Sequence, residues 1–191
     1  VNVTANNQDT VQEEATYQPI DAEVTVSKTV DKAEYQSQDR LTYTIIVTNT
    51  QRVWATKVNV VDLVNRVSAE TIYGNTVTAF EPGSIEITAL SNKGTTALPA
   101  LSGDYIDDTL DIAPEDTITI TVKGTLKPII IGEVINTVSV EYDDKSLIDE
   151  ASSLPITPRI EVVKAPIEEY YTPGQPNGFT ITITNKDAGF A

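Results

Sequence analysis

The sequence predicts an all-β protein folded as an antiparallel β-sandwich. Segments that alternate apolar and polar residues are rich in Val, Ile, Thr and Tyr, and short segments with Pro, Gly, Asn and Asp separate them. No segment has the spacing of an amphipathic helix. With 40% hydrophobic residues among 191, the chain can bury a core of one large domain or one and a fraction.

The predicted strands follow one another along most of the chain. Turn residues lie between them, as in EPGS (81–84) and APED (113–116), at the spacing of an antiparallel sandwich. The segments with strand-like alternation are 24–30, 41–49, 58–64, 84–90, 116–124 and 133–142.

Composition excludes several functional classes. The 28 acidic and 13 basic residues give a net charge of −15, which repels phosphate backbones and anionic lipid, so neither nucleic-acid binding nor membrane binding is expected. The absence of Cys and His excludes thiol nucleophiles, Cys/His metal sites and His-dependent triads. No stretch has the length of a membrane span. We expect no conventional enzyme and no cofactor.

An internal repeat organises the chain. A shift of 136 residues aligns its start with its end without a gap, pairing Lys28 with Lys164 and TIIVTN (44–49) with TITITN (180–185). We interpret the chain as a window cut from a tandem array, in which neighbouring repeats are one another's partners.

The repeat divides the chain into three predicted parts. Residues 1–19 are the last strand and linker of a preceding repeat, 20–155 a complete sandwich repeat, and 156–191 the truncated start of the next. Acidic and small polar residues with a Pro predict linkers at 13–23 and 149–159. Short linkers of this kind favour an extended rod.

Three predicted strands each carry one polar residue on a face of valines, because residues two apart share a face. A lone buried charge is costly, so these polar side chains are expected to meet one another. They are Lys28 among Val24, Val26 and Val30, Asp62 among Val58, Val60 and Val64, and Asn136 among Val134, Val138 and Val140.

Together these residues predict a cross-linking reaction. Burial lowers the pKa of a lysine and raises that of an aspartic acid, which yields a neutral amine beside a protonated acid. Lys28 could then attack the amide of Asn136 while Asp62 polarises the amide and carries protons, giving a Lys–Asn isopeptide bond. The alternative is an ordinary Lys28–Asp62 salt bridge at a strand end, with Asn136 in a turn or bulge.

Asn49 is a rival partner for Lys28. It shares the face of Tyr43 and Ile45 and recurs as Asn185. It also ends its strand, where Asn commonly organises a turn.

Four motifs carry a family resemblance. In order, VTVSKTVDKAEYQSQDRLTYTIIVTNT (24–50), VNVVDLV (58–64), APEDTITITVKGTL (113–126) and GEVINTVSVEYDD (132–144) resemble the "domain of unknown function 11" repeat of bacterial surface proteins. The resemblance covers about residues 22–142. It implies an immunoglobulin-like sandwich, repeated in extracellular proteins of the bacterial cell surface or cell wall.

The resemblance also implies roles for residues. Similar domains of Gram-positive adhesins and pilins carry spontaneous Lys–Asn bonds that join the first and last strands, assisted by an Asp or Glu between them. These roles fall on Lys28, Asn136 and Asp62. The glycine of the family's turn before the second strand is missing from QSQD (36–39). The leading hypothesis is a structural stalk or fibre module, with any host ligand bound by other parts of the parent protein.

Acidic segments raise a weaker calcium hypothesis. DYIDDTLD (104–111) and YDDKSLIDE (142–150) could supply oxygen ligands, but neither has the spacing of a defined calcium loop, so solvated loops are the preferred interpretation. The candidate ligands are Asp107, Asp108, Asp143 and Asp144.

Two other functions stay open. The repeat could itself be an adhesive module for a host protein or glycan, through Trp54, Tyr73 or Tyr105 in loops. It could also be a filament subunit, in which VNVTA (1–5) adds as a strand to a neighbour.

Overall fold

Burial along β5 (Arg40–Asn49) shows why the chain forms a sandwich. Leu41, Tyr43, Ile45 and Val47 are fully buried, and the residues between them are at least partly exposed. A strand with one buried face needs a second layer to cover it. The structure, a computed structural model, describes residues 2–3, 11–12, 16–98, 101, 103–170 and 172–186.

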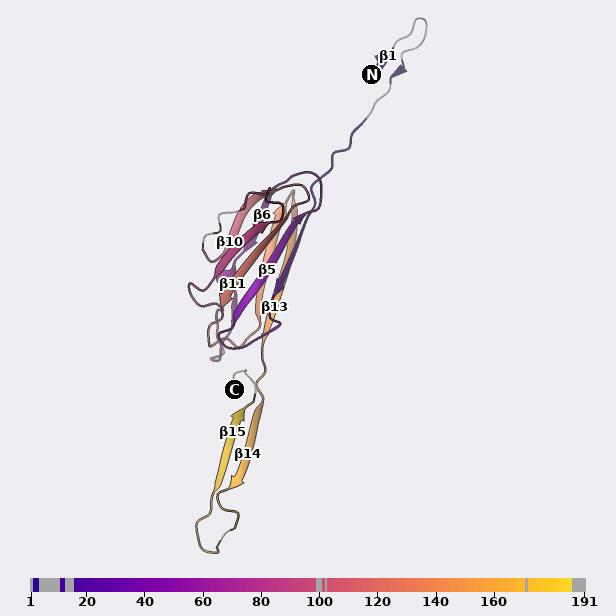
Figure 1. Ribbon diagram of the computed structural model, residues 1–191. Coiled ribbons are helices and arrows are strands. Elements are labelled where there is room, and N and C mark those ends of the chain that lie inside the picture. Colours follow the sequence, from indigo (N-terminus) through magenta and orange to yellow (C-terminus); the bar gives the residue numbers. More distant parts are fainter. Residues whose placement is uncertain are drawn as a thin grey trace.

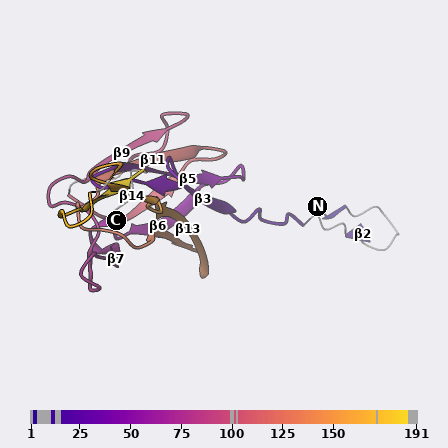
Figure 2. The ribbon, with the colours of Figure 1, turned by 90° about the horizontal axis from the view of Figure 1, so that it is seen from below.

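Two sheets lie face to face and enclose the core (Figure 1). Viewed along the sandwich, β9, β11, β5 and β3 form one layer, and β6 and β13 lie in the other (Figure 2). The four-stranded sheet has the order β3 (Val24–Val30), β5, β11 (Thr117–Thr125), β9 (Glu86–Ser91). The five-stranded sheet has the order β10 (Ile106–Ile112), β6 (Ala55–Asp62), β12 (Val134–Tyr142), β13 (Lys145–Pro155), β4 (Glu34–Tyr35).

The predicted all-β, immunoglobulin-like fold class is therefore confirmed. The first two long strands share a sheet with a later pair, and β6 lies in the other sheet beside β12, which pairs with β13, as in immunoglobulin-type sandwiches. Strand pairs in both sheets are antiparallel, apart from the short parallel pairing of β13 with β4.

Several strands differ from their predicted bounds. The acidic segment 104–111, expected to be a loop, contains most of β10, in which Ile106, Leu110 and Ile112 are buried. Residues 149–155, expected to begin a linker, form the second half of β13. The exposed acidic residues Asp107 and Asp111 of β10 and Glu150 of β13 made both segments resemble loops in sequence. The end of the segment 58–64 turns into a short 3-10 helix, η1 (Val64–Arg66), and β7 (Ser68–Glu70) pairs with β8 (Thr76–Thr78).

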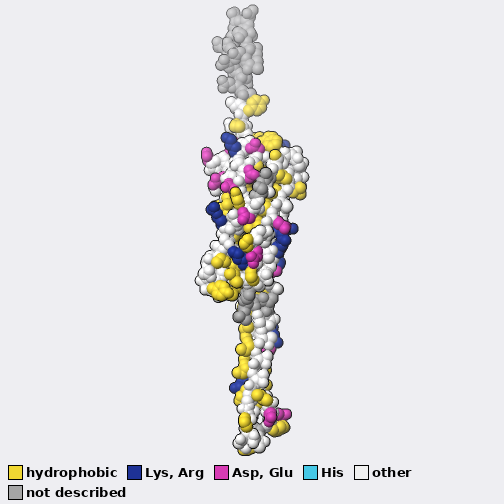
Figure 3. All heavy atoms as spheres, turned by 90° about the vertical axis from the view of Figure 1, so that its left-hand side faces the viewer, with side chains coloured by type: hydrophobic (Ala, Val, Ile, Leu, Met, Phe, Trp, Pro, Cys, Tyr) yellow, Lys and Arg dark blue, Asp and Glu magenta, His cyan; other side chains and the backbone are white. Residues whose placement is uncertain are grey.

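After β13, β14 (Ile160–Pro166) and β15 (Phe179–Asn185) form a separate hairpin. Lys164 pairs with Ile181 in this hairpin, and Lys28 pairs with Ile45 in the sandwich. The two pairs are related by the same shift of 136 residues, so the register of the sequence repeat is also the register of strand pairing. In the hairpin the apolar side chains are exposed, and they line one side of its surface (Figure 3).

Little of the N-terminal segment lies among the described residues. β1 (Asn2–Val3) pairs with β2 (Val11–Gln12). The other residues of VNVTA, which the filament hypothesis uses, lie outside the described part. No helix among the described residues is long and apolar enough to cross a membrane.

Candidate functional site

Lys28, Asp62 and Asn136 meet between the two sheets. Lys28 extends from β3 of the four-stranded sheet, whereas Asp62 and Asn136 belong to β6 and β12 of the five-stranded sheet. The exposed fraction of these residues is 5% or less. Asn136 lies on β12, the strand before the last strand of the sandwich, because β13 follows it.

One carboxylate oxygen contacts both partners of the candidate cross-link. Lys28 Nζ donates a hydrogen bond to Asp62 Oδ2 at 2.6 Å. Asn136 Nδ2 donates to the same oxygen at 3.3 Å. Both side chains of the Lys28–Asp62 pair have zero exposure, so water does not screen their interaction.

Burial moves both members of the pair towards their neutral forms. Desolvation lowers the pKa of the Lys28 amine, although the nearby carboxylates of Asp62 and Asp149 oppose the change. Desolvation likewise raises the pKa of the Asp62 carboxyl, against the effects of Lys28 and Asn136. The environment therefore shifts the pair in the direction of a neutral amine next to a protonated acid.

The other oxygen of Asp62 has no hydrogen-bond partner among the described residues, although it is buried. A buried carboxylate oxygen without a partner is costly when charged. This oxygen can carry the proton of the neutral acid while Oδ2 stays in contact with the two nitrogens. The ring of Tyr43 closes the site, with Lys28 Nζ 5.4 Å from the ring centroid.

Asp149 on β13 makes a further contact that the sequence did not predict. Its Oδ2 accepts a hydrogen bond from the backbone N–H of Lys28 at 2.6 Å. The residue falls within the segment expected to be a linker, and its only signal in the sequence is that Leu147 and Ala151 share its strand face.

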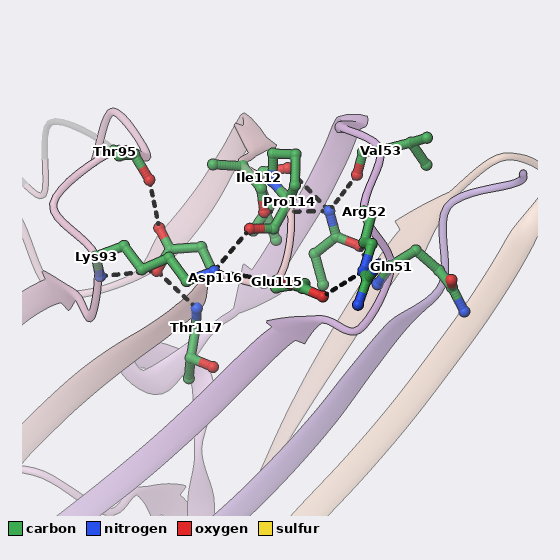
Figure 4. Close-up of polar contacts among 12 residues, drawn as sticks. Gln51, Arg52, Val53, Lys93, Thr95, Ile112, Pro114, Glu115, Asp116 and Thr117 are labelled. Carbon is green, nitrogen blue, oxygen red and sulfur yellow. Dashed lines mark hydrogen bonds and ion pairs between the residues drawn. The ribbon is translucent and has the colours of Figure 1, made fainter.

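Asn49 does not lie with Lys28. It pairs with Val24, four residues before Lys28 on β3. Its side-chain amide donates to the backbone carbonyls of Val53, Ile112 and Ala113, and its Oδ1 accepts from the backbone N–H of Gln51 (Figure 4). These contacts give Asn49 the turn-organising role that the sequence left open as an alternative.

Asp116 forms a second buried polar cluster, also absent from the sequence prediction. Its carboxylate accepts hydrogen bonds from the hydroxyls of Ser91 and Thr96. It also accepts from the backbone N–H groups of Lys93 and Thr117 (Figure 4). Burial alone would raise the pKa of Asp116, but these donors together lower it below its usual range. The cluster ties the loop after β9 to the start of β11.

The calcium candidates occupy strand and turn positions. Asp107 and Asp108 lie on β10 opposite Val61 and Val60 of β6. Asp143 and Asp144 form the two-residue turn between β12 and β13, with φ angles of 44° and 61°. The described residues hold no group of three or more acidic side chains placed to bind a metal ion.

The candidate ligand-binding aromatics do not form one surface. Trp54 precedes the start of β6, whereas Tyr105 precedes Ile106, which pairs with Asp62 at the opposite end of β6. Tyr73 lies in the loop between β7 and β8 and is 76% exposed. Trp54 borders a surface hollow, shared with Leu98, Asp108 and Asp111.

No protein-family model and no curated protein matches the sequence. The resemblance to "domain of unknown function 11" therefore rests on its motifs alone. The following solved structures are similar to parts of this chain.

A family 123 glycoside hydrolase from Clostridium perfringens has 12% identity and a TM-score of 0.41, with 69% of this chain and 28% of that chain covered. The pilus backbone RrgB from Streptococcus pneumoniae has 19% identity and a TM-score of 0.40, with 64% of this chain and 32% of that chain covered. The major pilin SpaD from Corynebacterium diphtheriae has 19% identity and a TM-score of 0.38, with 80% of this chain and 40% of that chain covered. This chain thus spans less than half of each of these proteins.

Proposed function

We propose that this chain is a structural stalk or fibre module of an extracellular bacterial surface protein, stapled by a self-formed isopeptide bond between Lys28 and Asn136. The observation that carries the proposal is the shared contact of Asp62 Oδ2 with the amine of Lys28 and the amide of Asn136. One acid thereby touches both the nucleophile and the leaving group.

The proposed reaction balances without a cofactor. Neutral Lys28 Nζ attacks Cγ of Asn136, forming a C–N bond, and the bond from Cγ to Nδ2 breaks. A proton leaves Nζ and reaches Nδ2 through Asp62, so that ammonia departs and Asp62 returns to its starting state. The reaction occurs once in each molecule, and there is no turnover.

The position of the bond suits a module in a stalk. β3 enters the sandwich at one end, and β13 leaves it at the other, towards the hairpin (Figure 1). Tension applied along the chain pulls these strands in opposite directions, and β3 belongs to a different sheet from β12 and β13. A Lys28–Asn136 bond joins the two sheets covalently, so that tension cannot separate them.

Intact-mass measurement of the purified chain tests the proposal. We expect a mass one ammonia below that of the sequence, and a peptide that joins Lys28 to Asn136 after proteolysis. Asp62→Ala and Asn136→Ala should each restore the full mass, apart from the substitution itself. Asn92→Ala, at an exposed position, should still lose ammonia. A folded wild-type chain of full mass would disprove the proposal.

A second candidate function, glycan binding, rests on the hollow beside Trp54. This side chain is 51% exposed, and Asp108 and Asp111 border the same hollow. An aromatic ring with nearby carboxylates can stack on a sugar and accept its hydroxyl hydrogens. A glycan array probed with wild type and Trp54→Ala tests this function. Glycan binding by wild type that Trp54→Ala loses would support it, and the absence of binding by wild type would contradict it.

A further inference from the structure

The backbone of Lys28 is held by a residue outside the reacting group. β3 is the edge strand of its sheet and pairs with β5 only. Its other edge faces β13, where Asp149 Oδ2 accepts the backbone N–H of Lys28 at 2.6 Å. The contact joins residues 121 positions apart in sequence and bridges the two sheets at the residue that carries the reacting amine.

Asp149 is also close in register to the electrophile. On β13 it pairs with Val138, and two residues further along Ala151 pairs with Asn136. Asp149 and Asn136 therefore lie diagonally on neighbouring strands and share a sheet face. Diagonal neighbours of this kind are typically about 7–8 Å apart. The side chain that holds the Lys28 backbone and the side chain that Lys28 would attack belong to one hairpin.

From this arrangement we propose that Asp149 is a positioning residue for the cross-link, an inference that rests on the proposed Lys28–Asn136 bond. By holding the backbone of Lys28, Asp149 fixes the position of Lys28 along β13. The amine is thereby placed opposite Asn136, which belongs to the same β12–β13 hairpin as Asp149. Reactions of this kind depend on the alignment of the reacting atoms, and a small displacement lowers the rate steeply. The sequence repeat places another acidic residue, Glu13, at the corresponding position.

The contact has a second possible use, which the experiment must separate. An exposed strand edge invites pairing with another chain, and Asp149 could simply block the edge of β3. A residue with that role alone would change association or stability, but it would leave the rate of bond formation in the folded molecule unchanged.

The test measures the rate at which the Lys28–Asn136 bond forms during refolding. Unreacted chain is isolated from inclusion bodies in urea and refolded by dilution, and samples are quenched in acid for mass measurement. Far-UV circular dichroism gives the folded fraction, so that the rate is expressed per folded molecule. The variants are Asp149→Ala, Asp149→Asn and the control Glu150→Ala, which changes the exposed neighbouring residue on the opposite face of β13.

We expect Asp149→Ala to lose ammonia about tenfold or more slowly than wild type. Asp149→Asn retains an acceptor oxygen and should recover most of the rate, and Glu150→Ala should match wild type. Equal rates for Asp149→Ala and wild type would overturn the positioning role but leave the cross-link intact. If Asp149→Ala does not fold, the Asn variant decides, because a rate about tenfold or more below wild type in Asp149→Asn would contradict positioning by a hydrogen bond.

The failure of the proposed function looks different from the failure of this inference. A wild-type chain that refolds and keeps its full mass overturns both. A wild-type chain that loses ammonia at the same rate as every Asp149 variant overturns only the role of Asp149.

Discussion

Lys28 Nζ and Asp62 Oδ2 lie 2.6 Å apart between the two sheets, with no exposed surface on either side chain. A buried pair of this kind rarely stabilises a fold more than apolar side chains of the same size would, because both groups lose their hydration. The proposed cross-link would give this pair a chemical use through the contact of Asp62 with Asn136.

Loss of the cross-link should lower stability without changing the fold. Asn136→Ala removes the electrophile, and a bond closing a loop of roughly a hundred residues contributes on the order of 4–5 kcal/mol through the unfolded state. We expect the unfolding free energy in urea to fall by about that amount relative to cross-linked wild type. Asn92→Ala should leave it within about 0.5 kcal/mol, as expected for an exposed position.

Bond formation should have a bell-shaped dependence on pH. The Lys28–Asp62 pair must hold one proton, which resides on the acid in the reactive form. Acid adds a second proton, to the amine, and base removes the remaining one. Because burial raises the pKa of Asp62 above 3.8 and lowers that of Lys28 below 10.5, the alkaline limb should lie above 3.8 and the acid limb below 10.5. Refolding of unreacted chain at a series of pH values, followed by mass, measures the profile. A rate that rises steadily with pH would contradict the role of Asp62 as an acid.

Asp116 should affect stability but not cross-linking. Asp116→Asn weakens a carboxylate that accepts from Ser91, Thr96 and two backbone N–H groups, so we expect a loss of about 1.5–3 kcal/mol at pH 7. The folded-state pKa of Asp116 is lowered, so its stabilisation is present above the unfolded value of 3.8 and is lost as the pH falls below it.

Urea unfolding of wild type and Asp116→Asn at pH 7 and near pH 3 measures this change. The difference between the two proteins should be smaller at the lower pH. Asp116→Asn should still lose one ammonia. If the folded variant instead kept the full mass of its sequence, the Asp116 cluster would affect the reaction of Lys28 with Asn136, which would contradict this prediction.

The acidic turn between β12 and β13 should tolerate the loss of its charges. Asp143 and Asp144 both have positive φ, which Asn and Gly adopt more readily in a two-residue hairpin turn. The double variant Asp143→Asn, Asp144→Gly should therefore keep or raise the melting temperature. Thermal unfolding with calcium and with a chelator checks the turn against the calcium hypothesis. Calcium-dependent stabilisation that the double variant lacks would favour the metal.

Strand parity predicted which polar residues turn inward. Lys28, Asp62 and Asn136 each interrupt a face of valines, and buried charges must find partners, so their meeting could be inferred from the sequence. The same rule placed Asn49 on an inward face. It could not distinguish Asn49 from Asn136, because the backbone carbonyls that hold Asn49 come from loops whose course depends on the tertiary fold.

Other features could not be predicted, for a physical reason. Asp107 and Asp111 of β10 and Glu150 of β13 lie on exposed faces, where solvent accepts charge at little cost, and the composition of these strands therefore resembled that of loops. Asp116 and Asp149 each bond to backbone N–H groups or hydroxyls brought close by folding, and nothing in the local sequence of an acidic chain singles out such a carboxylate.

With the proposed Lys28–Asn136 bond in place, the turn at Asp143 and Asp144 would give the module a limited extensibility. A bond at Asn136 leaves the chain from there to Pro155 outside the covalent loop, doubled back as the hairpin of β12 and β13. Pulling on the two ends loads this hairpin at its open end, since the force enters β12 at Asn136, opposite Ala151, and leaves β13 at Pro155. When its hydrogen bonds give way, the module lengthens by roughly 60 Å or less, at about 3.3–3.6 Å per residue, and then stops. Each repeat would thus extend by a fixed maximum length under force, and its hairpin would form again when the force falls.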